Sequence, residues 1–317
     1  MAFKNVVVAG GGVLGSQIAY QTAFRGFQTT IWLRSEESIT RTQPKLDRLH
    51  SIYLAELNAA KSTLGNPNAS YSRGLITDPQ NLTIEKIDEL IQKAEDAYKN
   101  LRLEVDMAKA VSNADLVIES MAENPQDKIA FYSKLADLLP AHTIVATNSS
   151  SMVPSAFRDY TKRPEKYLAI HFANNIWRSN TAEIMGHDTT SPEAFEAVAE
   201  FAAQIAMVPL RLYKEQPGYI LNSMLIPFLN SAEALWVNEV SDPETIDLTW
   251  KLGTGSPLGP FQILDIVGLT TAYNITSNNP LAKDPESLPG RVAAKLKEYI
   301  DAGKTGINAG EGFYKYK

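Results

Sequence analysis

The sequence predicts an α/β N-terminal domain with an inserted helical hairpin, followed by an all-α C-terminal domain. Three observations lead to this fold class. Short β-branched strands alternate with helical segments up to residue 212, as in a parallel sheet covered by helices. Two long charged segments interrupt this alternation, and no convincing strand follows Glu215. We therefore predict a first domain at residues 1–213 and a second at 214–317.

The first elements form a strand–turn–helix–strand unit, which is typical of a nucleotide-binding half. Two long helices with charged, periodic sequence follow, although Pro44 interrupts the start of the first; we expect them to form the inserted hairpin. The predicted elements are strand 4–9, helix 16–25, strand 28–33, helices 38–64 and 84–110, strand 116–118, helix 127–138, strands 143–146, 167–170 and 182–185, helix 192–205 and strand 208–212.

A glycine-rich turn joins the first strand to the first helix and matches the pattern G-x-G-x-x-G. Gly10 permits the tight turn, Gly12 lets a pyrophosphate approach the backbone, and Gly15 lets the helix pack closely on the strand. The first residues of the helix, Val13 and Leu14, offer free N–H groups to the phosphates. The position of this turn predicts a Rossmann-type domain that binds a nicotinamide dinucleotide.

The end of the second strand bears on the choice between NAD and NADP. NAD sites usually carry an acidic residue about 20 residues after the turn, for the ribose 2′-hydroxyl. Here Arg34 and Ser35 stand at that place, and Glu36 and Glu37 come slightly late. Arg34 can pair with a 2′-phosphate and Ser35 can donate to it, which favours NADP over NAD. The alternative is a solvated arginine beside a serine that caps the next helix.

Further motifs recur in a fixed order along almost the whole chain. They are Gly10–Gly15, Glu119–Asn124, Asn148–Ser151, His171-Phe172, Glu183, Pro217–Asn222, Gly259–Phe261 and Gly310–Tyr314. In this order and spacing the sequence resembles the L-3-hydroxyacyl-CoA dehydrogenase family, which includes 3-hydroxybutyryl-CoA dehydrogenases. The resemblance implies hydride transfer between NAD(P)(H) and C3 of a 3-hydroxyacyl or 3-oxoacyl compound.

The resemblance points to His171 and Glu183 as a catalytic pair, and the residues support this independently. His171 ends a predicted strand at the carboxyl edge of the sheet, where open α/β sheets bind ligands. Its imidazole can take or return the hydroxyl proton near neutral pH. Glu183 lies on the next predicted strand, and its carboxylate can orient the imidazole. The alternative for His171 is a structural histidine.

Five further site residues follow from the resemblance. Ser150 matches a substrate-binding serine and Asn222 a second hydrogen-bond donor, and both can steady charge on the reacting oxygen. Asn174, Glu123 and Lys128 match positions that contact the cofactor. The alternatives are a turn or cap role for Ser150 and a surface position for the two charged residues.

The chain also departs from the family pattern. The family's usual Asn-Pro after His-Phe is Asn174-Asn175 here, and Trp177 follows soon after. The helix after the second strand lacks a clear match to the serine and lysine that hold CoA phosphates in relatives; Lys45 lies there, out of register. The lead substrate is therefore a short acyl-CoA such as 3-hydroxybutyryl-CoA, with a free 3-oxo acid, ester or diketone as the alternative.

Composition limits the remaining classes of function. The formal net charge of -6 disfavours nucleic acid as a partner, and the absence of cysteine excludes thiolate chemistry and disulfides. The four histidines show no metal-ligand spacing, so we expect no metal. We expect no membrane partner, because no apolar run approaches a membrane span, and a cytoplasmic location.

The resemblance also implies a homodimer formed by the helical domain. Apolar stripes in that domain fit this expectation, and core packing within one copy is the alternative. A non-catalytic NAD(P)-binding sensor or structural protein is the competing class of function.

Overall fold

The computed structural model describes residues 3–316. The chain divides into two compact units, Met1–Ile220 and Leu221–Lys317, close to the predicted boundary after Tyr213. The first unit holds the sheet, and the second is helical, so the predicted fold class is confirmed.

The first unit is built on a mainly parallel sheet of eight strands within the described residues, in the order β3-β2-β1-β4-β5-β6-β7-β8. β7 runs antiparallel to β6, and β8 pairs with β7 in parallel. The strand order reverses direction between β1 and β4, which is where open α/β sheets bind ligands. The strands are β1 (Asn5–Ala9), β2 (Gln28–Trp32), β3 (Arg102–Glu104), β4 (Leu116–Glu119), β5 (Ile144–Thr147), β6 (Tyr167–Phe172), β7 (Thr181–Met185) and β8 (Val208–Leu212).

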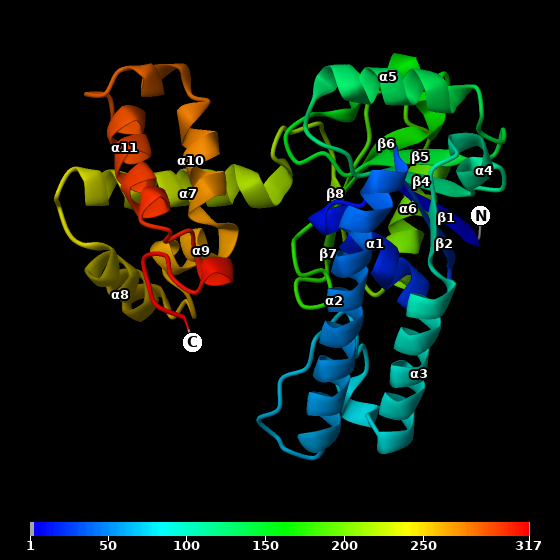
Figure 1. Ribbon diagram of the computed structural model, residues 1–317, viewed down its shortest axis with the longest axis horizontal. Helices are drawn as coiled ribbons and strands as arrows, with labels where there is room; N and C mark the ends of the chain where they lie inside the picture. Colours follow the sequence, from blue (N-terminus) through cyan, green and yellow to red (C-terminus); the bar gives the residue numbers. More distant parts are fainter. Residues whose placement is uncertain (1–2, 317) are drawn as a thin grey trace. The chain divides into compact units, whose positions relative to one another are not determined.

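Helices cover both faces of this sheet (Figure 1). Side chains of a strand point alternately to its two faces. Val6 and Val8 of β1 accordingly join a core with α1, α6 and the hairpin helices, whereas Val7 joins a second core with α4 and α5. The helices of this unit are α1 (Val13–Phe24), α2 (Glu36–Ser62), α3 (Ile84–Asn100), α4 (Met107–Val111), α5 (Pro125–Ala136) and α6 (Pro192–Gln204).

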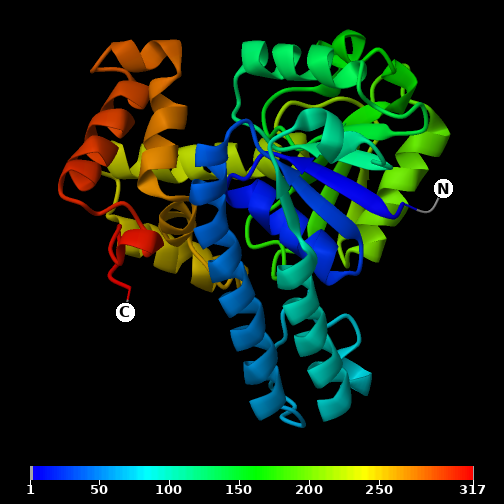
Figure 2. The ribbon, with the colours of Figure 1, turned by 45° about the vertical axis from the view of Figure 1, so that its right-hand side comes forward.

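Helices α2 and α3 lie side by side and project beyond the sheet as the predicted hairpin (Figures 1 and 2). Two details of the prediction were wrong. α2 begins at Glu36 and continues through Pro44 without a break. The second long helix ends at Asn100, where Leu101 becomes extended and Arg102–Glu104 pairs with β2 as an edge strand. A charged strand suits a sheet edge, and this pairing outweighs the helical periodicity of the segment.

The second unit packs the rest of α7 and four further helices around an aromatic core in which Trp236 contacts Phe261 and Phe313. Two buried carboxylates organise it: Asp247 accepts the first N–H groups of α9, and Asp265 accepts those of Phe313 and Tyr314. The helices are α7 (Tyr219–Val237), α8 (Pro243–Thr254), α9 (Pro260–Val267), α10 (Leu269–Ser277) and α11 (Leu288–Asp301).

Within residues 3–316, α7 is the one helix long and apolar enough to cross a membrane, on length and composition alone. The sequence expectation that no apolar run approaches a membrane span is thus wrong by these two criteria, because the 19 residues of α7 include a single charged side chain, Glu233. Core helices of soluble proteins also meet them, so the helix is weak evidence for a membrane.

Candidate active site

The glycine turn has the geometry that a dinucleotide site requires. Gly10 has a φ of 119°, and a Cβ there would lie 2.4 Å from the carbonyl oxygen of Ser120. A Cβ at Gly15 would lie 2.2 Å from the carbonyl oxygen of Gly10, so this glycine allows α1 to pack closely on the strand. A Cβ at Gly12 would meet no atom within 4 Å, which leaves the space above the turn open. The start of α1, at Val13, has no side-chain cap, so its N–H groups face that space.

A cavity of about 280 Å³ adjoins this turn. Besides Arg34, it is lined by two further cations of α2, Arg41 and Lys45. From the sequence, Arg41 was not considered, and Lys45 was considered only for the phosphates of CoA. Arg41 donates to Ser38 Oγ at 2.9 Å, and the Ser35 hydroxyl lies 3.1 Å from the same oxygen. Ser35 is the N-cap residue of α2, although its side chain makes no cap hydrogen bond, and Arg34 is exposed, so the alternative of a solvated arginine stays open. The cavity therefore presents three basic side chains beside the phosphate-binding turn.

His171 and Glu183 face each other across the antiparallel pair of β6 and β7, where they are direct partners in the register. His171 Nδ1 lies 2.9 Å from Glu183 Oε2, and the two side chains are 5% and 3% exposed. The sequence prediction that the two residues lie on adjacent strands is confirmed. A carboxylate can only accept, so Nδ1 donates, and in the neutral imidazole this arrangement leaves the lone pair on Nε2.

The segment after β5, Asn148–Ser151, forms what we call the serine loop. Ser150 Oγ lies 3.2 Å from His171 Nε2, on the side of the ring away from Glu183. The loop is held by Glu123, which accepts from Ser149 Oγ at 2.7 Å, from Ser150 N at 3.0 Å and from Ser151 Oγ at 3.2 Å. The structure thus connects Ser150, His171 and Glu183 by hydrogen bonds, and we call these three residues the catalytic row.

Lys128 and Glu119 form a buried ion pair beneath the serine loop. Both side chains are fully buried, with Lys128 Nζ 2.6 Å from Glu119 Oε1. Glu119 Oε2 also accepts from Thr147, whose hydroxyl oxygen accepts the N–H of Ser149. The alternative of a surface position is therefore wrong for Lys128, although it holds for Glu123. The predicted cofactor contacts of both residues stay predictions.

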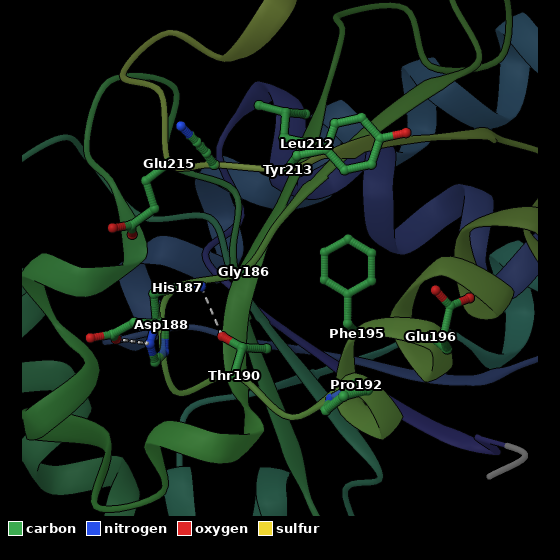
Figure 3. A pocket seen from close by; sticks show the side chains of 11 residues that line it. Gly186, His187, Asp188, Thr190, Pro192, Phe195, Glu196, Leu212, Tyr213 and Glu215 are labelled. Carbon is green, nitrogen blue, oxygen red and sulfur yellow. Dashed lines mark hydrogen bonds and ion pairs between the residues drawn. The ribbon is translucent and has the colours of Figure 1, made fainter.

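A further cavity in the first unit lies away from Ser150, His171 and Glu183. It measures about 520 Å³ and lies where β7 and β8 end, beside α6 (Figure 3). Because β7 runs antiparallel to β6, its last residue, Met185, pairs with Ala169, two positions before His171. This cavity is therefore at the edge of the sheet opposite the glycine turn.

Two family models match the chain in sequence. The model of the 3-hydroxyacyl-CoA dehydrogenase NAD binding domain matches residues 5–216, and that of the 3-hydroxyacyl-CoA dehydrogenase C-terminal domain matches residues 218–316. The chain belongs to the 3-hydroxyacyl-CoA dehydrogenase family. It is an oxidoreductase that acts on CH–OH groups, and its first unit binds NAD(P). The competing interpretation as a non-catalytic protein is therefore not supported.

Individual relatives cover the full length of the chain. It is 30% identical to the mitochondrial hydroxyacyl-coenzyme A dehydrogenase of Rattus norvegicus, over 99% of this chain and 91% of that protein. It is 28% identical to a probable 3-hydroxybutyryl-CoA dehydrogenase of Bacillus subtilis, over 100% and 99%. Among solved structures, a diketoreductase that acts on dicarbonyl compounds is 44% identical, with a TM-score of 0.84 and full coverage of both chains.

Within this family, the loop after β6 differs in a way that the structure explains. Asn175 stands where the family pattern has proline, and its φ is 59°. Its N–H donates to Gln17 Oε1 at 2.9 Å. Proline is restricted to a φ near −65° and has no N–H, so it fits neither feature. Asn174 is exposed beside it, and its predicted contact with the cofactor stays a prediction.

Two groups of residues escaped the sequence interpretation. Tyr219 lies in the motif Pro217–Asn222, and its ring stacks on His171 with a centroid distance of 4.4 Å, a contact that the sequence does not predict. Arg41 and Lys45 follow Arg34 on the first turns of α2, and helical spacing could have placed them on one face. Asn222 lies in the second unit, on α7, and its role stays a prediction.

Proposed function

We propose that the chain catalyses reversible oxidation of the C3 hydroxyl of a short 3-hydroxyacyl-CoA, with His171 as the base. The observation that carries the proposal is the buried pair of His171 and Glu183, with Nε2 beside Ser150 Oγ. A nicotinamide dinucleotide bound at the glycine turn supplies the hydride acceptor or donor, and the open space above Gly12 fits such a group.

The residues of the row divide the proton chemistry between them. His171 Nε2 takes the hydroxyl proton of the substrate during oxidation and returns it to the oxygen during reduction. The Glu183 carboxylate fixes the tautomer and stabilises the imidazolium that forms. Ser150 donates a hydrogen bond to the reacting oxygen, and Asn222 is proposed to do the same.

We propose NADP(H) as the preferred cofactor. Three cations, Arg34, Arg41 and Lys45, line the cavity beside the glycine turn, and no acidic residue directly follows β2. Arginine pairs well with a 2′-phosphate, which NAD lacks. Asp127 also lines the cavity and opposes an added anion, so the preference depends on the three cations outweighing one carboxylate.

A substrate without CoA is the second candidate, and a specific observation favours it. The diketoreductase is 44% identical to this chain, whereas the curated dehydrogenases above are 28–30% identical. In addition, α2 lacks a clear match to the serine and lysine that hold CoA phosphates in relatives, which also favours a substrate without CoA. An ester or diketone offers the same carbonyl to His171, so the proposed chemistry is unchanged.

One steady-state panel tests these proposals. Acetoacetyl-CoA, ethyl acetoacetate and a diketone are each mixed with NADH or NADPH, and cofactor absorbance is followed. Turnover of the thioester that is lost in His171→Gln supports the lead function. Turnover of the ester or diketone alone would replace the CoA substrate, and full activity of His171→Gln would refute the assigned base.

A homodimer formed through the second unit is also proposed. Of the apolar stripe on α7, Leu229 and Trp236 belong to the core of one copy, whereas Met224 and Leu235 are exposed. Such exposed residues suit an interface, and light scattering of the purified chain tests this. A cytoplasmic location is a further proposal, tested by fractionation of expressing cells.

A further inference from the structure

We infer that the dipeptide Tyr219-Ile220 is a positioning element that sets the geometry and the proton affinity of the His171 imidazole. This inference rests on the proposed function, since it concerns the same base. It assigns a role in catalysis to a residue that neither touches the reacting atoms nor exchanges a proton.

The dipeptide contacts His171, Glu183 and Ser149, the residue before Ser150. The Tyr219 ring lies parallel to the His171 imidazole, with an angle of 11° between their planes. The Tyr219 hydroxyl donates to the carbonyl oxygen of Ser149 at 2.8 Å, next to Ser150 in the serine loop. The N–H of Ile220 donates to Glu183 Oε1 at 2.9 Å, which leaves Oε2 for His171.

The backbone of this segment is held in an uncommon conformation. Gly218 has a φ of 81°, and Tyr219 follows with a φ of 55°. A left-handed conformation costs free energy in a tyrosine and persists only where surrounding contacts hold it. Here the conformation lets one residue place its ring under the imidazole while the next residue turns its N–H to the carboxylate. The strained turn thus holds the Tyr219 ring against the imidazole and the Ile220 N–H against the Glu183 carboxylate.

The stacked ring acts on the charge of the imidazole. When His171 takes the substrate proton it becomes a cation, and the face of an aromatic ring attracts a cation. The Tyr219 phenol is itself kept neutral, because burial and then the nearby Glu123 and Glu183 raise its pKa above its ordinary value. It therefore serves as a neutral platform and not as a second acid.

The other groups around the ring have to be considered with it. Glu183 faces the imidazole from β7, and Ser150 faces it from the serine loop, which Glu123 holds. Glu119 and Glu215 also raise the pKa of the Tyr219 phenol from a distance. Glu183, Glu123 and Glu215 favour the imidazolium, whereas the charge of Glu119 is offset by its buried partner Lys128. The change of Tyr219 alone removes none of these groups.

Two variants separate the ring from its hydroxyl. Tyr219→Phe keeps the stacked face and loses the hydrogen bond to Ser149, whereas Tyr219→Met fills much of the volume without an aromatic face. The readout is the pH profile of kcat/KM for oxidation of 3-hydroxybutyryl-CoA, or of ethyl 3-hydroxybutyrate if only the ester turns over. The neutral base is the active form, so the acidic limb of the profile reports its pKa.

We expect Tyr219→Met to lower the apparent pKa of that limb by about 0.5–1 unit, because the imidazolium loses its stacked partner. Tyr219→Phe should leave the limb unchanged and lower kcat several-fold through the serine loop. Tyr20→Met is the control: Tyr20 is fully buried in α1 away from the row, so its loss should lower stability without moving the limb.

An unchanged limb in Tyr219→Met, or a shift in Tyr219→Phe as large as that in Tyr219→Met, would overturn the inference. If Tyr219→Met does not fold, the Phe variant decides, because a shifted limb there contradicts a role of the ring face. If the proposed function itself is wrong, the pH profile of the wild-type chain will have no acidic limb that disappears in His171→Gln.

Discussion

The buried carboxyl of Glu233 makes stability depend on pH in a way that can be measured. Glu233 lies on α7 and is 4% exposed, and its Oε1 has no hydrogen-bond partner within the described part of the chain. Burial raises its pKa from the ordinary 4.5 to about 7. Since one pKa unit corresponds to about 1.36 kcal/mol, burial of the charged form costs about 3 kcal/mol.

The direction follows from proton binding. Between pH 4.5 and about 7 the folded chain holds this proton more tightly than the unfolded chain, so the free energy of unfolding falls as pH rises through that window. Above this pH window the folded chain is destabilised by the full cost of burying the charged carboxylate, and below the window that cost is absent. Glu233→Gln carries no charge at any pH, so it should match the wild type at pH 4.5 and exceed it by about 3 kcal/mol at pH 8.

Urea unfolding followed by tryptophan fluorescence measures this difference, and Trp236 reports locally because it lies one turn along α7. The matched control is Glu298→Gln, which removes an exposed carboxylate from the same unit and should change stability equally little at both pH values. A gain from Glu233→Gln of the same size at pH 4.5 and pH 8 would refute the argument, because packing and not charge would then be its cause.

Three further predictions concern the first unit. Arg34→Ala should weaken NADPH binding by about 1–3 kcal/mol and NADH binding much less, measured by fluorescence titration; equal losses would contradict a 2′-phosphate contact. Glu183→Gln should lower kcat by about a hundredfold to ten-thousandfold with little change in cofactor affinity, and near-normal turnover would remove its orienting role. Asn175→Pro should destabilise the chain by about 3 kcal/mol in thermal unfolding, whereas Asn175→Gly, which tolerates the observed φ, should stay within about 1 kcal/mol.

The elements that sequence could predict are those set by local pattern. β-branched runs bounded by glycine gave the strands on either side of α1, and the antiparallel partner of β6 was placed on the correct neighbouring strand. The short strand β3 was missed because its helical periodicity is real, and only pairing with β2 makes the segment extended. Tertiary pairing of this kind is not visible in the local sequence.

The same limit applies to the site. His171 and Glu183 could be found because their residue types and spacing carry chemistry. Lys128 was predicted to contact the cofactor, with a surface position at the polar start of α5 as the alternative, yet its side chain is fully buried against Glu119. Glu119 ends β4, nine residues before Lys128 in α5, and a lysine is almost never fully buried unless it is paired. Such a pair becomes visible only when β4 and α5 are placed in space.

The register of β6 and β7 explains why this row works as one unit. Side chains alternate between the faces of a sheet, so a shift of one residue would turn Glu183 away from His171. The observed register places them as direct partners, and the Ile220 N–H occupies the other carboxylate oxygen, which prevents Glu183 from rotating away. The orientation of the base therefore depends on strand pairing and on the start of α7 together. A change of the Tyr219 side chain, or Ile220→Pro, which removes the backbone N–H, should consequently affect turnover even though neither residue was recognised from its chemistry.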